Sequence, residues 1–311
     1  MLLGCLSIQA ANDDLITKQI TINLDKAGTL PNKIASSEMY KITNLKIIGE
    51  INGTDWNMIR EMAGRDNRGY GTEGKLSVLD LSEAKIVKGG DSYYPGDNCY
   101  TSNDEIGEKA FTDCSRLTSL TLPVGITSIG YDAFAYCSGL TSLTLPAGIT
   151  SIGEYAFSGC SGLTSLTLPA GITSIDKYAF SGCSRLTSLT LPAGITSIGE
   201  FAFSYCSGLT SIYVYAEKVP RIGRYAFEGC ASRKCTLYVP KGTYDNYRLS
   251  EFGYFENIVE FDATGIDKTT TSTDVEEVSR YSLNGQRLAV PVKGLNIVKY
   301  SDGSARKVVV K

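Results

Sequence analysis

The sequence predicts an α/β repeat solenoid, in which short parallel strands alternate with irregular or helical turns on the convex side, followed by a small all-β domain. Three observations lead to this fold class. A cysteine recurs at intervals of 23 residues through the middle of the chain. A Phe lies three residues before each of these cysteines, and alternating leucines follow most of them. Two strand–turn–strand patterns lie near the end of the chain.

The repeated unit reads I-G-x-x-A-F-x-x-C-S-x-L-T-S-L-T-L-P-x-G-I-T-S. Its cysteines are Cys114, Cys137, Cys160, Cys183, Cys206 and, one residue late, Cys230. Its Phe residues are Phe111, Phe134, Phe157, Phe180, Phe203 and Phe227. A period in the twenties that contains L-x-x-L-x-L is the signature of a leucine-rich repeat. The fold class is therefore a leucine-rich-repeat solenoid.

Each part of the unit has a structural reason. The alternation over residues 120–122 predicts a short strand, and Pro123, which has no amide hydrogen, ends its ladder. Gly125 permits a turn, and residues 131–136 then form a short helical or irregular turn. One coil cannot enclose its own apolar side chains, so neighbouring coils must stack. Stacking would place the Phe, Cys and aliphatic residues in buried columns.

The pattern continues beyond the regular units. Weaker versions of the strand motif lie at residues 42–47, 76–81 and 237–240. We therefore expect about eight stacked strands between residues 42 and 240. Residues 15–24 should pair with or cover the first coil, and residues 241–261 should shield the last one. Such caps are needed because an open coil end would expose the core.

The unit resembles the BspA-type leucine-rich repeat of bacterial surface proteins, over roughly residues 40–261. The resemblance implies an exported protein, commonly from Bacteroides-like bacteria. Members of the family are associated with adhesion to host extracellular-matrix proteins or to other bacteria. The resemblance implies no enzyme, and no family-wide set of binding residues exists to carry over.

The first ten residues are apolar, end in small residues and precede a polar run. We expect them to be the remnant of a signal peptide with cleavage near Ala10. A second interpretation takes residues 2–5 as a lipobox, in which Cys5 would be acylated. A third treats the segment as a plain apolar start. Export is the favoured interpretation.

The C-terminal tail begins with a polar, Thr-rich linker. Asn284-Gly285 and Asp302-Gly303 are turn pairs between strand-like segments and predict two hairpins. This small domain would either dock on the solenoid or be marginally stable until a partner binds. It resembles the C-terminal sorting domain of the type IX secretion system, at residues 283–287, 293–297 and 307–311. The alternative is a β-sandwich remnant with no targeting role.

The chain thus divides into six expected segments. They are the signal-peptide remnant (1–10), the N-terminal cap with irregular leucine-rich repeats (11–104), the regular 23-residue repeats (105–240), the C-terminal cap (241–261), the linker (262–277) and the small β domain, which is sorting-like (278–311).

Composition excludes several kinds of chemistry. The chain has no histidine, which removes the commonest general base and metal ligand. Its net charge of −3 argues against nucleic-acid binding, and no apolar run approaches the roughly 20 residues of a transmembrane helix. We expect a protein that is not an enzyme, with no catalytic residues, no metal and no cofactor.

The nine cysteines do not predict a metal site, which needs four ligands converging on one point. Thiols at the repeat spacing would form a column, where they act as small inert hydrophobes. We expect them to be reduced. Cys99, Cys230 and Cys235 are less regular, and the last two could pair across a loop.

Two loops contain residues of the kinds that bind ligands. The insertion at residues 85–105 contains Asp91, Asp97, Asn98, Asn103 and Asp104, which could chelate calcium. It lacks the spacing of a known calcium loop. The glycine-rich residues 64–74 lack the following Lys-Ser/Thr helix start of a phosphate-binding loop, so they are more readily explained as an excursion between the second and third strands.

The strands of a leucine-rich repeat line a concave face, and their outward positions are the natural contact surface. In the regular repeats these positions form a flat face of Ser119, Thr121, Ser142, Thr144, Ser165, Thr167, Ser188 and Thr190. Such a face lacks the aromatic residues that dominate binding energy. Aromatic residues gather at the two ends instead, as Tyr213, Tyr215 and Tyr238, and as Tyr93, Tyr94 and Tyr100. We expect binding energy at one of these ends, although tyrosine is also an ordinary strand residue.

Three function classes remain open. The first is an adhesin that recognises host or bacterial surface proteins, favoured by the expected export and sorting tail. The second is a glycan-binding surface module, because exposed tyrosines could stack on sugar rings. The third is a structural spacer, favoured by the near-identical middle repeats. Partners would be proteins or glycans, with attachment to the outer membrane or cell surface.

Overall fold

The computed structural model describes residues 15–94, 96 and 99–263, and four strands of the C-terminal tail with the side chains of Ile297 and Val298. The expected signal-peptide remnant, with Cys5, and most of the expected linker lie outside the described residues.

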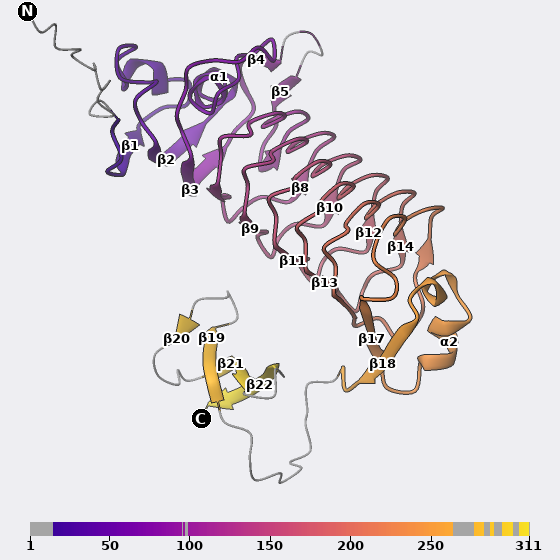
Figure 1. Ribbon diagram of the computed structural model, residues 1–311. Helices are drawn as coiled ribbons and strands as arrows, with labels where there is room; N and C mark the ends of the chain where they lie inside the picture. The colour runs from indigo at the N-terminus through magenta and orange to yellow at the C-terminus, as the bar shows by residue number, and fades with distance from the viewer. Residues whose placement is uncertain are drawn as a thin grey trace, which may run out of the picture.

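The predicted solenoid is confirmed (Figure 1). Ten parallel strands stack along it: β1 (Ile20–Leu24), β2 (Asn44–Ile51), β3 (Val78–Ile86), β7 (Ser119–Thr121), β9 (Ser142–Thr144), β11 (Ser165–Thr167), β13 (Ser188–Leu191), β15 (Ser211–Val214), β17 (Thr236–Pro240) and β18 (Asn257–Phe261). They form two five-stranded sheets, ordered β1-β2-β3-β7-β9 and β11-β13-β15-β17-β18. The Thr164 N–H donates to the Thr141 carbonyl across the junction between the sheets (3.3 Å). We call the outward side of these strands the strand face.

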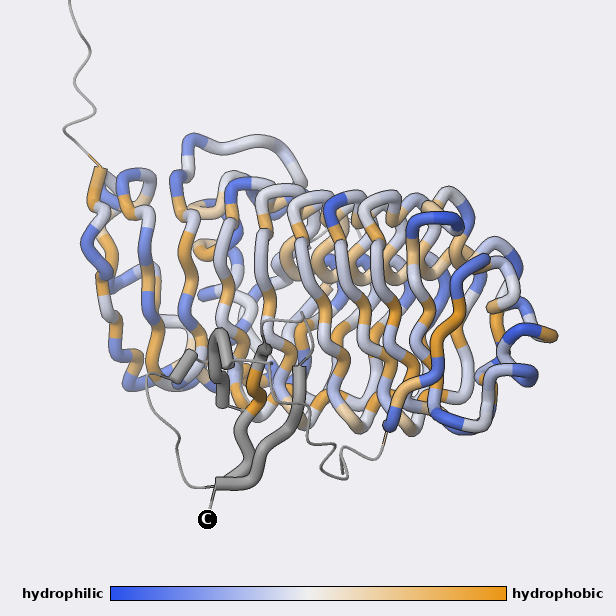
Figure 2. Tube along the Cα trace, turned by 60° about the horizontal axis from the view of Figure 1, so that its bottom comes forward, coloured by the Kyte–Doolittle hydropathy of each residue, from blue (hydrophilic) through white to orange (hydrophobic). Residues whose placement is uncertain are grey.

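A second set of strands lies on another side of each winding. These strands have two residues each: β6 (Glu105–Ile106), β8 (Ser128–Ile129), β10 (Ser151–Ile152), β12 (Ser174–Ile175), β14 (Ser197–Ile198) and β16 (Arg221–Ile222). They form two three-stranded parallel sheets. The same order of hydrophobic and hydrophilic residues recurs from winding to winding (Figure 2).

The turn after each short strand is irregular rather than helical. It contains two left-handed residues per winding, such as Asp132 (φ 53°) and Tyr136 (φ 59°). This backbone lets amides bond along the solenoid axis, as where the Phe134 N–H donates to the Ala156 carbonyl of the next winding (2.7 Å). The turns therefore stack through their own hydrogen-bond ladder.

The expected columns of Phe and Cys are confirmed. The six Phe rings are buried and follow one another with centroids 5.0 to 5.5 Å apart. Each later thiol donates to a Phe carbonyl of the preceding winding, as from Cys160 to Phe134 (3.0 Å). None of the eight cysteines within the described residues, Cys230 and Cys235 included, forms a disulfide.

The N-terminal cap contains elements that the sequence analysis did not anticipate. They are the 3-10 helix η1 (Leu30–Asn32), helix α1 (Gly53–Met62) and the antiparallel pair β4 (Gly89–Tyr94) and β5 (Cys99–Thr101). Strand β1 pairs with β2 and so extends the sheet. Trp56 of α1 lies against Phe111 (5.1 Å between ring centroids) and donates from its Nε1 to the Ala110 carbonyl (3.0 Å). Helix α1 therefore closes the first end of the Phe column.

The C-terminal cap closes the other end. It contains α2 (Tyr244–Arg248), the 3-10 helix η3 (Glu251–Tyr254) and β18. Phe252 and Phe255 pack on Phe227 with ring centroids 5.7 and 5.3 Å away. The buried Tyr247 hydroxyl donates to the Ala216 carbonyl (2.6 Å). Aromatic side chains thus take the place of a further repeat.

The described part of the tail is a four-stranded antiparallel sheet in the order β20-β19-β21-β22. Its strands are β19 (Glu277–Ser282), β20 (Arg287–Leu288), β21 (Gly294–Tyr300) and β22 (Ala305–Val310). The pairings of β19 with β20 and of β21 with β22 match the two expected hairpins. Both predicted turn pairs lie outside the described residues.

Candidate ligand-binding surface

The candidate calcium ligands do not converge in the part of the chain that the structure describes. That part holds no cluster of three or more His, Cys, Asp or Glu side chains able to bind a metal. Asp91 accepts from the Thr54 hydroxyl (2.8 Å), and Asn103 accepts from the Lys88 amide (2.8 Å). Asp97 and Asn98 lie outside the described residues. Asp91 thus links the insertion to helix α1, and Asn103 binds the backbone of the insertion itself.

The repeat cysteines are packing groups rather than nucleophiles. Burial raises the pKa of Cys114 to about 11, against the lowering effect of Arg60 and Arg65. Burial likewise raises the pKa of Cys137 and Cys160 well above the ordinary value. Since only the thiolate attacks or binds metal, these thiols are inert at neutral pH.

The strand face of the regular repeats is rich in hydroxyl groups. Its Ser and Thr residues stand in register, with Ser142 opposite Ser119 and Thr144 opposite Thr121. A neighbouring column of threonines, which the sequence analysis overlooked, is already hydrogen-bonded. The Thr141 hydroxyl donates to the Thr118 carbonyl (3.1 Å), and the pattern recurs along the stack. This column stabilises the stack.

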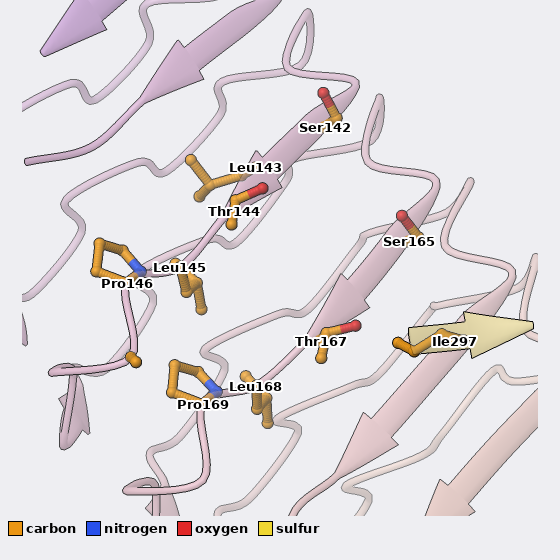
Figure 3. A pocket seen from close by; sticks show the side chains of 11 residues that line it. Ser142, Leu143, Thr144, Leu145, Pro146, Ser165, Thr167, Leu168, Pro169 and Ile297 are labelled. Atoms are coloured by element: carbon orange, nitrogen blue, oxygen red, sulfur yellow. The ribbon is translucent and has the colours of Figure 1, made fainter. Parts of the chain in front are cut away.

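A cavity of about 680 Å³ lies over β9 and β11, where the two large sheets meet (Figure 3). Apolar residues contribute much of its lining: Leu143, Leu145, Pro146, Ala147, Leu168 and Pro169. Ser142, Thr144, Ser165 and Thr167 add hydroxyls, and Ile297 of β21 lines the same cavity. None of the described residues that line the cavity has an ionisable side chain. The cavity offers weak apolar contacts and hydroxyl hydrogen bonds.

The predicted C-terminal tyrosines come together. Tyr213 and Tyr238 are neighbours in β15 and β17, and their rings stack with centroids 4.4 Å apart. Phe261 of β18 meets Tyr213 and Tyr215 edge-on, at 6.0 and 5.1 Å. Partial burial raises the pKa of Tyr213 and Tyr215, which keeps both hydroxyls protonated. We call these four residues the strand-face aromatic cluster.

Phe261 was missed because it lies in the expected cap. The available signal was the strand-favouring residues Ile258, Val259 and Phe261, which indicate one more strand. The register places Val259 opposite Tyr238 and Phe261 two residues further along the same strand. The cluster thus spans three neighbouring strands.

The N-terminal tyrosines do not form a comparable surface. Tyr93 is only 1% exposed, and its hydroxyl donates to the Glu108 carbonyl (2.8 Å). The expectation that Tyr93 contacts a ligand is therefore wrong, because its ring packs inward against Trp56 (6.3 Å). Tyr94 is half-buried beneath the cations of Arg60 and Lys109. Only Tyr100 of the three is exposed.

A second set of aromatic side chains lies on the turns. Tyr155, Tyr178, Phe201 and Tyr225 occupy the same position of successive units, two residues before the buried Phe. Their ring centroids are 4.6, 4.9 and 5.1 Å apart. We call these four the turn aromatic row. This row was not expected, although the recurrence of aromatic residues before A-F in the sequence was an available signal.

Comparisons with known proteins agree with the repeat pattern. Residues 104–234 match, in six copies, the family model described as BspA type Leucine rich repeat region. This span covers the regular units, so the repeats match the type that their sequence resembles. No curated protein matches the sequence.

Several solved structures are similar to parts of the chain. The leucine-rich repeat protein of T. pallidum is 29% identical, with 48% of this chain and 72% of that chain covered and a TM-score of 0.41. A leucine-rich cell surface protein of Faecalibacterium prausnitzii is 23% identical, with 70% and 51% covered and a TM-score of 0.35. A leucine-rich repeat protein of Bacteroides ovatus is 19% identical, with 81% and 74% covered and a TM-score of 0.33.

Proposed function

We propose that this protein is exported to the cell surface and binds a protein of a host or of another bacterium through the strand-face aromatic cluster. The main support for this proposal is a change in residue type along the strand face. The stacked pair Tyr213 and Tyr238 continues a row that is occupied by Thr167 and Thr190 in preceding strands.

The export part of the proposal has separate support. The repeats match the BspA type, and the tail resembles a surface-sorting domain in its hairpin motifs. The described residues contain no helix that could cross a membrane. Attachment would then depend on the tail or on residues at the start of the chain.

The energetics favour the cluster over the rest of the strand face. Tyrosine is enriched among residues that dominate protein interfaces, whereas serine and threonine are under-represented there. The rings of Tyr213 and Tyr238 are held parallel, within 5°, and are half-buried. Side chains that are already ordered lose little conformational entropy on binding. The cluster can therefore contribute apolar contact area at small entropic cost.

The surroundings of the cluster suit a protein ligand. Thr236 and Asn257 lie two residues before Tyr238 and Val259 in their strands, and they hydrogen-bond to each other (2.6 Å). An aromatic centre with polar neighbours is the usual anatomy of a protein interface. No enclosed cavity is needed for such a contact, and a flat patch suits another protein surface.

The test is capture of immobilised host-matrix and bacterial surface proteins by the purified protein. The combined variant Tyr213→Ala, Tyr215→Ala, Tyr238→Ala should weaken capture at least several-fold. The matched control replaces Thr121, Thr144 and Thr167 by Ala on the same face and should bind like the wild type. Circular dichroism checks that both variants fold.

Unchanged capture by the tyrosine variant would discard the cluster as the binding site. If the wild-type protein retained none of the immobilised proteins, a structural spacer would be the better explanation. A loss of equal size in the threonine control would place the contact on the regular repeats instead.

A further inference from the structure

The turn aromatic row ends at a cavity. Its last member, Tyr225, is 58% exposed and lies against Phe201, with ring centroids 5.1 Å apart and ring planes tilted by 31°. A cavity of about 340 Å³ follows, lined by residues 222–228 of the last regular winding and by Glu251 and Tyr254 of η3. The cavity therefore lies between the end of the row and the C-terminal cap.

The C-terminal cap continues the buried Phe column but does not continue the turn aromatic row. In the core, Phe252 and Phe255 take the place of the next buried Phe by packing on Phe227. On the turns, the rings repeat at about 5 Å along the axis, so the next ring position beyond Tyr225 falls on the side of η3. The cavity borders both Tyr225 and η3, and among the described residues the ring neighbour of Tyr225 is Phe201 alone.

A second ring borders the same cavity. Tyr254 is 45% exposed, and its orientation is fixed because its hydroxyl donates to the Cys230 carbonyl (2.9 Å). Its ring also meets Phe255 edge-on at 5.3 Å. Both aromatic walls are thus held in place by the protein.

The polar residues that line this cavity are charged, whereas those of the cavity over β9 and β11 are serines and threonines. Glu228 and Glu251 supply two carboxylates, and Arg224 supplies a guanidinium, all from exposed residues. Carboxylates accept hydrogen bonds from hydroxyl groups, and a guanidinium donates several in a fixed geometry. These three groups together carry a net charge of −1, so the lining is not strongly selective for a cation or an anion.

We propose that this cavity binds the pyranose ring of a glycan, stacked on Tyr225. A pyranose has an apolar face of C–H groups, which packs on the electron-rich face of an aromatic ring. Its hydroxyls point around its edge, where carboxylate and guanidinium groups can bind them. The volume lies at the lower end of small-molecule pockets, which span about 300 to 1,000 Å³. One sugar residue or two would fit.

This site is independent of the proposed protein-binding surface. Tyr225 and Tyr254 belong to a turn and to η3, whereas the strand-face aromatic cluster belongs to β15, β17 and β18. A variant at one site should leave the other unaffected. Failure of either proposal can therefore be told apart from failure of the other.

The experiment is binding of the full-length protein to an array of neutral and acidic oligosaccharides, followed by titration with the oligosaccharides that bind. Tyr225→Ala should lower the apparent affinity at least ten-fold. Tyr225→Phe, which keeps the ring, should stay within about three-fold of the wild type. Glu228→Gln should weaken binding without abolishing it.

The matched control is Tyr136→Ala. Tyr136 is 60% exposed and has a left-handed backbone like that of Tyr225 (φ 59° and 57°), but it does not line the cavity. The control should bind glycans like the wild type. The proposal is overturned if the wild-type protein binds no glycan on the array, or if Tyr136→Ala and Tyr225→Ala lose affinity equally.

Discussion

Replacing one ring in the middle of the Phe column should destabilise the solenoid strongly. Phe157 is fully buried between Phe134 and Phe180, with ring centroids 5.0 and 5.2 Å away. Removal of a buried Phe side chain usually costs about 3 to 5 kcal/mol. Each aromatic contact adds about 0.5 to 1.5 kcal/mol to what burial alone provides.

The cavity left by Phe157→Ala cannot easily collapse. Ladder hydrogen bonds hold the backbone on both sides, from the Phe134 amide to the Ala156 carbonyl and from the Phe157 amide to the Ala179 carbonyl (both 2.7 Å). We therefore expect a loss of unfolding free energy near the upper end of the range, about 4 to 5 kcal/mol. For a domain of this size that corresponds to a fall in Tm of roughly 8 to 20 °C.

Thermal and urea unfolding followed by circular dichroism measure the effect. Phe201→Ala is the matched control, because Phe201 also has two ring neighbours, at 4.9 and 5.1 Å, but is only half-buried on the turns. Its loss should cost about 1 to 2 kcal/mol. If Phe157→Ala were no more destabilising than Phe201→Ala, the buried column would not be the main source of stability.

Three further outcomes are expected. The eight described cysteines should resist Ellman's reagent at pH 8 in the folded protein and react after denaturation, because all eight are buried and burial raises the pKa of Cys114 to about 11; fast reaction of the native protein would contradict this. Asp55→Ala should cost about 3 kcal/mol or more in urea unfolding, because the buried Asp55 carboxylate accepts from three backbone amides (2.6, 2.8 and 2.9 Å); a change within 0.5 kcal/mol, roughly that of an ordinary surface site, would refute it. Burial alone would raise the pKa of Asp80, but hydrogen bonds from Ser82 and the Lys46 ammonium outweigh it and lower that pKa. A lowered carboxyl pKa gives stability that is complete above the unfolded value of about 4 and is lost as the pH falls through the folded value. The stability difference between the wild type and Asp80→Asn should therefore shrink on acidification from pH 7 to pH 3, and a constant difference would speak against the ion pair.

The regular repeats could be predicted because each one has the same residue pattern. The 23-residue period fixed which residues align, so the strands around Leu120 and Leu143 and the columns of Phe and Cys followed directly. The two hairpins of the tail were visible for a local reason, since turn pairs such as Asn284-Gly285 mark them. The repeats could be recognised because their pattern recurs many times, and the hairpins because a turn is determined by a few neighbouring residues.

Other features depend on contacts between segments that are distant in the chain. Tyr93 is buried because β4 packs beside α1, and nothing in the residues around Tyr93 indicates that neighbour. The left-handed turn positions are hard to recognise because bulky residues such as Tyr178 and Phe201 occupy them, where glycine or asparagine would be expected. Stacking on the next winding offsets the backbone strain.

The candidate site beside the turn aromatic row also depends on contacts between residues that are distant in the sequence. Tyr155 and Tyr178 are 23 residues apart in sequence, and only the stacking of windings brings their rings to 4.6 Å. The cavity beside Tyr225 depends on η3, whose position is set by the packing of Phe252 and Phe255. Of the aromatic residues at the C-terminal end, only those on or beside the strands could be recognised from the sequence as candidate contacts.

A double-mutant cycle along the Phe column tests the stacked-winding account most directly. Phe157 and Phe180 are adjacent, with ring centroids 5.2 Å apart, and Phe134 and Phe203 are separated by those two rings. Alanine substitutions at the adjacent pair should couple by about 0.5 to 1.5 kcal/mol. Substitutions at the separated pair should add within about 0.5 kcal/mol. The account of stacked windings would be contradicted by additivity at Phe157 and Phe180, or by equal coupling at Phe134 and Phe203.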